Sequence, residues 1–270
     1  MSKSIAIDHP CSPESIRNLR WWTADLLSFT VTRPQALRYL PGQYARIALA
    51  SGHQLIWRPF SFVSAPSQDL LEFLAVMVPG GLFTDLLRHA DSGDTIWVEH
   101  ENYGFMTPDR FENGRVLWLL ATGTGIGAYL SILRDAQVWT EYQRIILVHG
   151  VRRTEQLVYR DELLTLQAAS RGNPQRAELT LLACISGPSH ATLDDSFSSG
   201  YRLISGRIST ALDSGELESR AGSRLAPESS RLMLCGNPTM IEELRKQLHL
   251  RGMVPCRRQK PGQFLTENYW

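Results

Sequence analysis

Two patterns of hydrophobic residues divide the chain. Across residues 22–99, apolar and polar positions alternate in short runs, as at Leu27, Phe29 and Val31, which are separated by polar side chains. A period of two is typical of strands that are buried on one face. Turns rich in proline and glycine separate the runs, so the region is predicted to be an antiparallel β-barrel. One helix is expected within it, over residues 82–89.

Beyond residue 108 the period changes. The run from Val116 to Leu120 is continuously apolar, as in a strand buried on both faces of a parallel sheet. Helical patterns alternate with this run and its successors. The predicted strands are 116–120, 145–149, 179–185 and 231–234, and the predicted helices are 126–136, 155–169, 207–213 and 238–250. This order predicts a doubly wound α/β fold.

The 270 residues are therefore expected to form two domains. Residues 1–110 are assigned to the N-terminal antiparallel β-barrel, and residues 111–270 to the C-terminal α/β domain with a doubly wound parallel sheet. The polar stretch 186–200 is interpreted as a surface loop of the second domain.

Composition and charge do not identify a function, but they argue against several classes of protein. A net charge of +1 gives no general attraction to nucleic acid or to a membrane surface. No apolar run approaches the ~20 residues of a membrane span, and the N-terminus lacks the apolar core of a signal peptide. The four cysteines, at positions 11, 184, 235 and 256, are too far apart for a zinc or iron–sulfur site. We expect a soluble cytoplasmic protein without a metal.

A glycine-rich turn follows the first parallel strand. It reads Thr122-Gly123-Thr124-Gly125-Ile126-Gly127 and leads into a helix. Glycines at this place let the backbone approach a pyrophosphate, and the helix N-terminus offers N–H groups and a partial positive charge. The turn therefore indicates a nucleotide site. The alternative is that the glycines serve only the geometry of the turn.

Arginines follow the second parallel strand. A site selective for NAD carries an acidic residue there for the ribose 2′-hydroxyl, whereas this chain has Arg152 and Arg153. Guanidinium groups pair with phosphate, so these residues favour the 2′-phosphate of NADP, and Arg207 is a candidate for a second contact. The alternative is that they are ordinary solvated arginines.

The barrel region carries two further candidate motifs. Arg58-Pro59-Phe60-Ser61 combines a phosphate ligand, an aromatic plane and a hydroxyl within four residues, a set suited to a flat ring that carries a pyrophosphate. Pro79-Gly80-Gly81-Leu82-Phe83-Thr84 is a glycine turn into a helix and suits a second phosphate contact. Taken alone, the first motif is also compatible with ordinary sheet packing.

Together these motifs resemble the ferredoxin–NADP+ reductase family in its bacterial branch, over essentially the whole chain. The resemblance extends to Cys235-Gly236-Asn237-Pro238 after the last predicted strand and to the aromatic tail Thr266-Glu267-Asn268-Tyr269-Trp270. It implies a non-covalently bound FAD in the barrel, NADP(H) on the α/β domain, and an enzyme that is a monomer.

The resemblance also implies roles for individual residues. Arg58 would hold the FAD pyrophosphate, Phe60 would stack on the flavin ring, and Ser61 would donate a hydrogen bond near its N5 atom. Cys235 would lie beside the nicotinamide, and Glu267 would act in a proton relay. Tyr269 and Trp270 would cover the flavin or its adenine.

Two departures from the family pattern bear on these roles. Phe60 stands where the family has tyrosine, so the stacking face is kept but a phenolic hydrogen bond is lost. Ser186-Gly187 stands where close bacterial relatives have another arginine, which reduces the expected contacts to the 2′-phosphate.

The resemblance predicts an FAD-dependent ferredoxin (flavodoxin)–NADP+ reductase, which exchanges a hydride with NADP(H) and single electrons with ferredoxin or flavodoxin. Residues 244–266 contain no acid and six basic residues, and this segment is expected to steer an acidic carrier; the alternative is a solvated surface. Other readings are a flavin reductase or oxygenase reductase of the same fold, and a non-catalytic nucleotide sensor.

Overall fold

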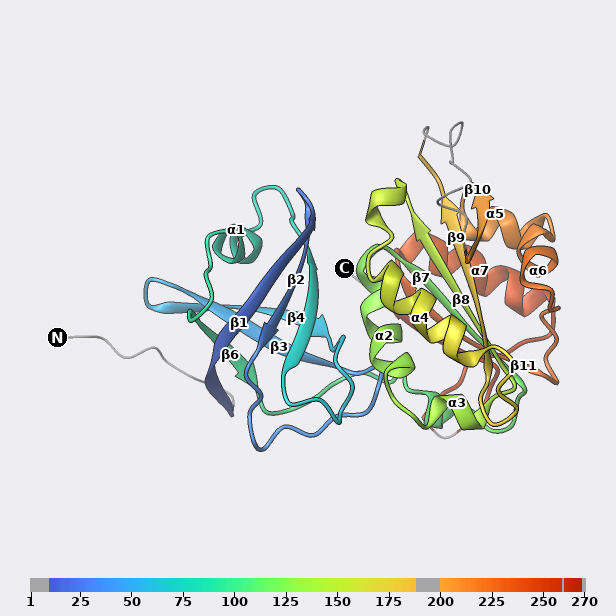
Figure 1. Ribbon diagram of the computed structural model, residues 1–270, viewed down its shortest axis with the longest axis horizontal. Coiled ribbons are helices and arrows are strands. Elements are labelled where there is room, and N and C mark those ends of the chain that lie inside the picture. Colours follow the sequence, from blue (N-terminus) through green and yellow to red (C-terminus); the bar gives the residue numbers. More distant parts are fainter. Residues whose placement is uncertain (1–9, 188–199, 259, 269–270) are drawn as a thin grey trace. The chain divides into compact units, whose positions relative to one another are not determined.

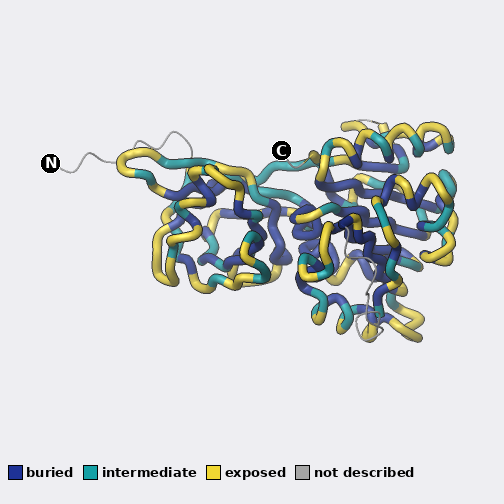
Figure 2. Tube along the Cα trace, turned by 90° about the horizontal axis from the view of Figure 1, so that it is seen from above, coloured by how far each residue is buried: buried dark blue, intermediate teal, exposed yellow. Residues whose placement is uncertain are grey.

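The computed structural model describes residues 10–187, 200–258 and 260–268 (Figure 1). Contacts between Cα atoms divide the chain into two compact units. The first, here called the barrel unit, contains Met1–Thr107 and Gly127–Asp135; the second, the α/β unit, contains Pro108–Ile126 and Ala136–Trp270. Figure 2 shows that buried residues run through the strands of each unit and that exposed residues lie mainly in the connections.

The barrel unit is built on a six-stranded antiparallel sheet in the order β4-β3-β6-β1-β2-β5. Its elements are β1 (Cys11–Thr23), β2 (Leu26–Val31), β3 (Tyr44–Ser51), β4 (Gln54–Ser61), β5 (Leu71–Val76), α1 (Leu82–Arg88) and β6 (Thr95–Glu99). The two edge strands β4 and β5 also contact each other, so the sheet curls into the expected barrel.

Aromatic and aliphatic side chains fill this barrel. Phe29, Phe62 and Phe73 are almost completely buried, and α1 adds Phe83 and Leu87 to the same cluster. Sequence analysis began the β-region at residue 22, whereas β1 begins at Cys11. The start was missed because most residues between 11 and 20 are only half-buried or exposed, which leaves no clear alternation to detect.

The α/β unit has a six-stranded parallel sheet in the order β10-β9-β8-β7-β11-β12, so the predicted fold class is confirmed. Its strands are β7 (Val116–Thr122), β8 (Arg144–Val151), β9 (Glu178–Ile185), β10 (Tyr201–Ser205), β11 (Ser230–Gly236) and β12 (Phe264–Asn268). Its helices are α3 (Val138–Glu141), α4 (Arg160–Ser170), α5 (Ile208–Asp213), α6 (Glu216–Ala221) and α7 (Pro238–Leu250). The helix α2 (Ile126–Leu133) begins in this unit and continues in the barrel unit.

Helices cover both faces of the parallel sheet. In Figure 1, α4 lies in front of the strands of this unit and α7 behind them. The apolar residues of α5, α6 and α7 pack on one face against side chains such as Trp118, Ile146 and Leu234. Burial on both faces explains why β7 and β8 read as continuous apolar runs.

Several element boundaries differ from the predictions. The helix expected over 155–169 begins only at Arg160, because residues 154–156 form a separate 3₁₀ turn and Tyr159 adopts a positive φ of 57°. The helix expected to reach residue 136 ends at Leu133. The elements α3, α6, β10 and β12 were not predicted. Most of the expected loop 186–200 lies outside the described residues.

Among the helices that the structure describes, none is both long and apolar enough to cross a membrane.

Candidate functional site

The glycine-rich turn lies at the carboxyl edge of the parallel sheet, directly after β7. Gly123–Gly125 form one 3₁₀ turn, and α2 begins at Ile126. Gly123 has a φ of +54°, a conformation that favours glycine. In open parallel sheets, ligands bind outside the carboxyl ends of the strands, so this turn is correctly placed for a nucleotide.

The turn after β11 interlocks with the glycine turn. A side chain at Gly125 would collide with the backbone oxygen of Cys235, 2.7 Å from where its Cβ would stand, and the Cys235 sulfur lies near the same point. Gly236, with a φ of +129°, packs against Thr122, and the Asn237 N–H donates to Thr122 Oγ1 over 2.8 Å. The structure therefore brings together Thr122, Gly125 and Cys235.

Cys235 and Glu267 are neighbours across β11 and β12, where their Cα atoms are register partners. Burial, and secondarily the Glu267 charge, raise the pKa of the Cys235 thiol well above its usual value. Burial also raises the pKa of Glu267, to about 7. The thiol is consequently uncharged at neutral pH, and the carboxyl group can exchange a proton there.

His149 is a further residue of this site that sequence analysis missed. It is buried on β8, and its Nε2 atom lies 3.0 Å from the carbonyl oxygen of Gly123. Burial lowers the pKa of His149 to about 4, although the hydrogen bond to Gly123 opposes this shift. The available signal was a lone histidine in the otherwise apolar strand that follows the glycine turn.

The three candidate phosphate arginines lie at the carboxyl ends of β8 and β10, the two strands that flank β9. Arg152 and Arg153 follow β8, and Arg207 follows β10; all three are exposed. Arg153 Nε is 3.9 Å from the Glu155 carboxylate, whereas Arg152 and Arg207 form no ion pair with any described residue. The two guanidinium groups are thus available to an anion.

Ser186 and Gly187 lie after β9, between the strands that carry these arginines. The Gly187 N–H donates to the carbonyl of Arg152 over 2.9 Å, and the Gly187 Cα is so close to that carbonyl that a Cβ would collide with it. Gly187 therefore allows the chain to pass directly beside Arg152.

In the barrel unit, Arg58 and Phe60 lie on one face of β4, and Ser61 lies on the other. Phe60 pairs with Ala45 in the ladder to β3, and its ring lies 5.3 Å from that of Phe83. The rings of Phe29 and Phe73 are 6.0 Å and 6.1 Å away.

One side of the Phe60 ring is thus supported by other aromatic rings, while the residue as a whole stays only half-buried. Arg58 is exposed, and within the described residues its guanidinium donates to the carbonyl of Trp57, over 2.7 Å. A supported ring with an accessible surface beside an exposed guanidinium fits a flat cofactor that carries a pyrophosphate. Ser61 is buried, and Pro59 is exposed. Alternation would place Phe62 on the face of Arg58 if the strand continued, but β4 ends at Ser61, and Phe62 is fully buried and stacks on Tyr39.

The second barrel motif forms a tight turn before α1. Gly80 has a φ of +71°, and Gly81 is the N-cap residue without a side-chain cap. The Thr84 hydroxyl lies 2.9 Å from the carbonyl of Gly81 and 3.1 Å from that of Val78, and it holds the turn together. Leu82 is half-exposed at the surface of the turn.

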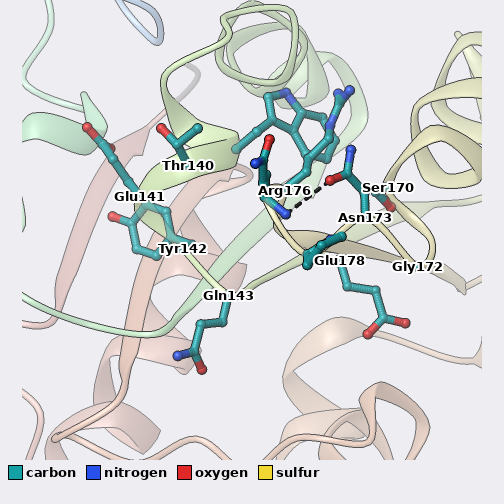
Figure 3. A pocket seen from close by; sticks show the side chains of 12 residues that line it. Thr140, Glu141, Tyr142, Gln143, Ser170, Gly172, Asn173, Arg176 and Glu178 are labelled. Carbon is teal, nitrogen blue, oxygen red and sulfur yellow. Dashed lines mark hydrogen bonds between the residues drawn. The ribbon is translucent and has the colours of Figure 1, made fainter.

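A separate pocket of about 660 Å³ lies elsewhere in the α/β unit (Figure 3). Its walls come from residues 139–143 and 170–178, at the amino ends of β8 and β9. The Arg176 guanidinium stacks on the Trp139 ring at 3.7 Å. The pocket is on the opposite edge of the sheet from the glycine turn and is not part of the nucleotide site.

Two candidate residues, Tyr269 and Trp270, lie outside the described residues. In the part of the chain that the structure describes, no cluster of potential metal ligands occurs. All four cysteines are free.

Comparisons with known proteins agree with this arrangement. A family model described as "FAD-binding domain" matches residues 13–102, and one described as "Oxidoreductase NAD-binding domain" matches residues 119–246. The flavodoxin/ferredoxin–NADP reductase of Buchnera aphidicola (subsp. Baizongia pistaciae) is 33% identical over 94% of this chain and 97% of its own. The protein of that name from Escherichia coli is also 33% identical, over 92% of this chain and 94% of its own.

A solved structure leads to the same conclusion. The ferredoxin NADP+ reductase of Neisseria gonorrhoeae, crystallised with FAD and NADP, superposes with a TM-score of 0.86 at 30% identity, covering 97% of this chain and 99% of its own. The chain therefore belongs to the flavodoxin/ferredoxin–NADP reductase family, and it is an FAD-dependent oxidoreductase that uses NADP(H).

Proposed function

We propose that this chain exchanges a hydride with NADP(H) and single electrons with ferredoxin or flavodoxin. The observation that carries the proposal is the interlocked turn of the α/β unit, in which Cys235 lies against Gly125 and beside Glu267. The names of its full-length relatives support ferredoxin or flavodoxin as the partner. The bound flavin would supply the chemistry that connects a two-electron donor with a one-electron acceptor.

In the barrel unit, the chain's own residues bind and orient FAD. Arg58 pairs with the pyrophosphate, and the phenylalanines behind Phe60 keep its ring in place for stacking. Pro59 fixes the backbone between them, and Ser61 would offer a hydroxyl as a hydrogen-bond donor to the flavin. Gly80, Gly81, Leu82 and Thr84 form the turn that receives a phosphate.

In the α/β unit, the turn from Thr122 to Gly125 receives the NADP(H) pyrophosphate with backbone N–H groups at the start of α2. Arg152 and Arg207 bind the 2′-phosphate from the ends of β8 and β10, which flank β9. Arg153, which already interacts with Glu155, contributes less. Selectivity for NADP(H) over NAD(H) follows from the two guanidinium groups.

Cys235 and Glu267 have different chemical roles in this proposal. Because its pKa is well above the usual value, the Cys235 thiol stays neutral and packs beside the nicotinamide as a small, polarizable group. Glu267, with a pKa of about 7, is poised to hold or release a proton at its carboxyl group as the flavin changes its charge.

The basic segment, residues 244–266, carries less unpaired positive charge than its sequence suggested. Two of its charges are paired with acids outside the segment: Lys246 with Glu242 of the same helix at 2.7 Å, and Arg251 with Glu218 of α6 at 2.8 Å. Four exposed basic residues remain without an ion pair within the described part of the chain. They are Arg245, Arg257, Arg258 and Lys260. We assign the steering of an acidic carrier to these four residues.

The four free thiols fit a reducing compartment, and we place the protein in the cytoplasm as a monomer. Fractionation of cells and sedimentation of the purified protein test these two points.

The reaction is tested by anaerobic titration of the FAD-loaded protein with NADPH and, separately, with NADH. We expect NADPH to bleach the flavin absorbance at a far lower concentration than NADH. A protein that binds no flavin, or whose flavin is bleached by neither nucleotide, would contradict the proposal.

A further inference from the structure

The carbonyl group of Gly123 is held from two sides. The N–H of Ile126 donates to it from the start of α2, as in a 3₁₀ turn. The imidazole of His149 approaches it from β8, with Nε2 at 3.0 Å. His149 is 26 residues away in the chain, so the second contact ties the glycine turn to the neighbouring strand. The Gly123 carbonyl is consequently fixed toward the interior of the α/β unit.

The direction of this carbonyl determines the direction of the next N–H group. The described residues contain no cis peptide bond, and in a trans peptide the oxygen and the amide hydrogen point to opposite sides. Because the Gly123 oxygen points toward the buried imidazole, the Thr124 N–H points away from it. An N–H group with this orientation faces outward at the carboxyl edge of the sheet, where a nucleotide pyrophosphate is received.

The surroundings of His149 keep a hydrogen on its Nε2 atom, which therefore acts as a constant hydrogen-bond donor. Gly123 offers only an acceptor, so the bond requires a hydrogen on Nε2. Nδ1 is buried and has no hydrogen-bond partner among the described residues, which leaves no acceptor for a second hydrogen. Burial also lowers the pKa of the ring to about 4, so His149 remains neutral at physiological pH. The ring therefore stays in one tautomer, with Nε2 as the donor.

We propose that His149 is a positioning residue for NADP(H): by binding the Gly123 carbonyl, it holds the Thr124 N–H toward the pyrophosphate. This inference rests on the proposed assignment of the glycine turn to NADP(H). His149 itself is buried and touches no ligand.

The test compares two ligands, of which only one has a pyrophosphate for the glycine turn to bind. NADP+ carries the pyrophosphate, whereas adenosine 2′-monophosphate has only the phosphate that Arg152 and Arg207 would bind. His149→Leu keeps an apolar side chain of similar size and removes the donor. We expect it to weaken NADP+ binding, measured by calorimetry on the FAD-loaded protein, by about tenfold and to leave adenosine 2′-monophosphate binding unchanged.

Two more variants separate positioning from packing. In His149→Gln the amide nitrogen can reach the same carbonyl, so NADP+ affinity is expected to return to within about threefold of the original protein. His149→Asn ends too short to reach it, and it is expected to behave as the leucine variant; it replaces that variant if the latter does not fold. Thr180→Val, which removes a buried hydroxyl from β9, is the matched control and should bind both ligands normally.

The outcomes distinguish the inference from the proposed function. Equal NADP+ affinity in the leucine, asparagine and original proteins would overturn the role of His149 and leave the site assignment intact. An equal loss for both ligands would also overturn it, because it would indicate a general distortion. Failure of the proposed function appears separately, as an original protein that binds neither NADP+ nor adenosine 2′-monophosphate.

Discussion

The two nucleotide sites of this chain are built in different ways. In the α/β unit the site is made of turns that lock into each other: Gly125 against Cys235, Gly236 against Thr122, and His149 beneath Gly123. In the barrel unit the proposed FAD contacts come from two separate motifs: the edge strand β4, on which Arg58 is exposed and Phe60 half-buried, and the turn before α1.

This difference concerns how far each site is preorganised. The α/β site is held by contacts between its turns that form without a ligand, so its geometry is a property of the fold. Substitutions in these turns should therefore lower the stability of the protein. The barrel site has one supported element, the Phe60 ring, and one free element, Arg58. A free side chain must be ordered when it binds, so part of the interaction energy is lost as side-chain entropy. Substitutions in the two sites should therefore affect stability and affinity in different proportions.

The largest effect is expected for Gly236→Ala. The new methyl group would collide with Thr122, at a φ of +129° that alanine adopts only under strain. We expect the free energy of unfolding of the protein to fall by about 3 kcal/mol, measured by urea denaturation. Gly206→Ala is the control, because its φ of +110° is equally unusual but no atom lies within 4 Å of the new methyl group. Similar losses in both variants would show that the interlocked turns contribute nothing beyond backbone strain.

The next effect is a pH dependence caused by Glu267. Its pKa is raised from 4.5 to about 7 in the folded state, so folding favours the protonated form. The stability that this preference provides is fully present below pH 4.5 and is lost as the pH rises toward 7. By linkage, the loss is up to ~3 kcal/mol.

Glu267→Gln should remove this contribution. Urea unfolding at pH 5 and at pH 8 gives the change in the free energy of unfolding between these two pH values. The difference in this change between the two proteins measures the contribution of Glu267. If both proteins lose the same stability between these pH values, the carboxyl group of Glu267 is not buried in the way described.

Arg58→Ala should mainly change affinity. Because the guanidinium is exposed and, among the described residues, donates a hydrogen bond to the Trp57 carbonyl alone, its removal leaves the barrel intact. We expect FAD to bind about tenfold to a hundredfold more weakly, as judged by fluorescence titration of the apoprotein, with little change in melting temperature. Arg17→Ala, another exposed arginine of the barrel unit, is the control. A melting temperature that falls as far as the affinity would place Arg58 with the structural contacts of the fold.

The sequence predicted best what depends on neighbours along the chain. The helix over 238–250 is observed as Pro238–Leu250, since Asn237 caps it and proline occupies its first turn. The continuous apolar run at Val116 correctly marked a central parallel strand. The edge strands β10 and β12 were missed because each has only five residues, with mixed exposed and buried positions.

The site shows the same limit. The residues of each motif are consecutive in the sequence, so the glycine turn could be found from the sequence alone. The contact between His149 and Gly123 could not, because it depends on the register of two parallel strands. The partial neutralisation of the basic segment was also invisible, since Glu218 belongs to α6, a helix that was not predicted.

The smallest effect is expected for the removal of surface charge. This change should affect the association with the protein partner and not the two nucleotide sites. Arg257→Ala and Arg258→Ala together remove two exposed charges without an ion pair within the described residues. Association with an acidic ferredoxin or flavodoxin should slow by a few-fold at low ionic strength, as measured by stopped-flow reduction, and the difference should shrink as salt is added. Lys246→Ala is the matched control, because Glu242 already neutralises this charge. A larger effect in the lysine variant would move the docking surface away from residues 257–260 and onto α7.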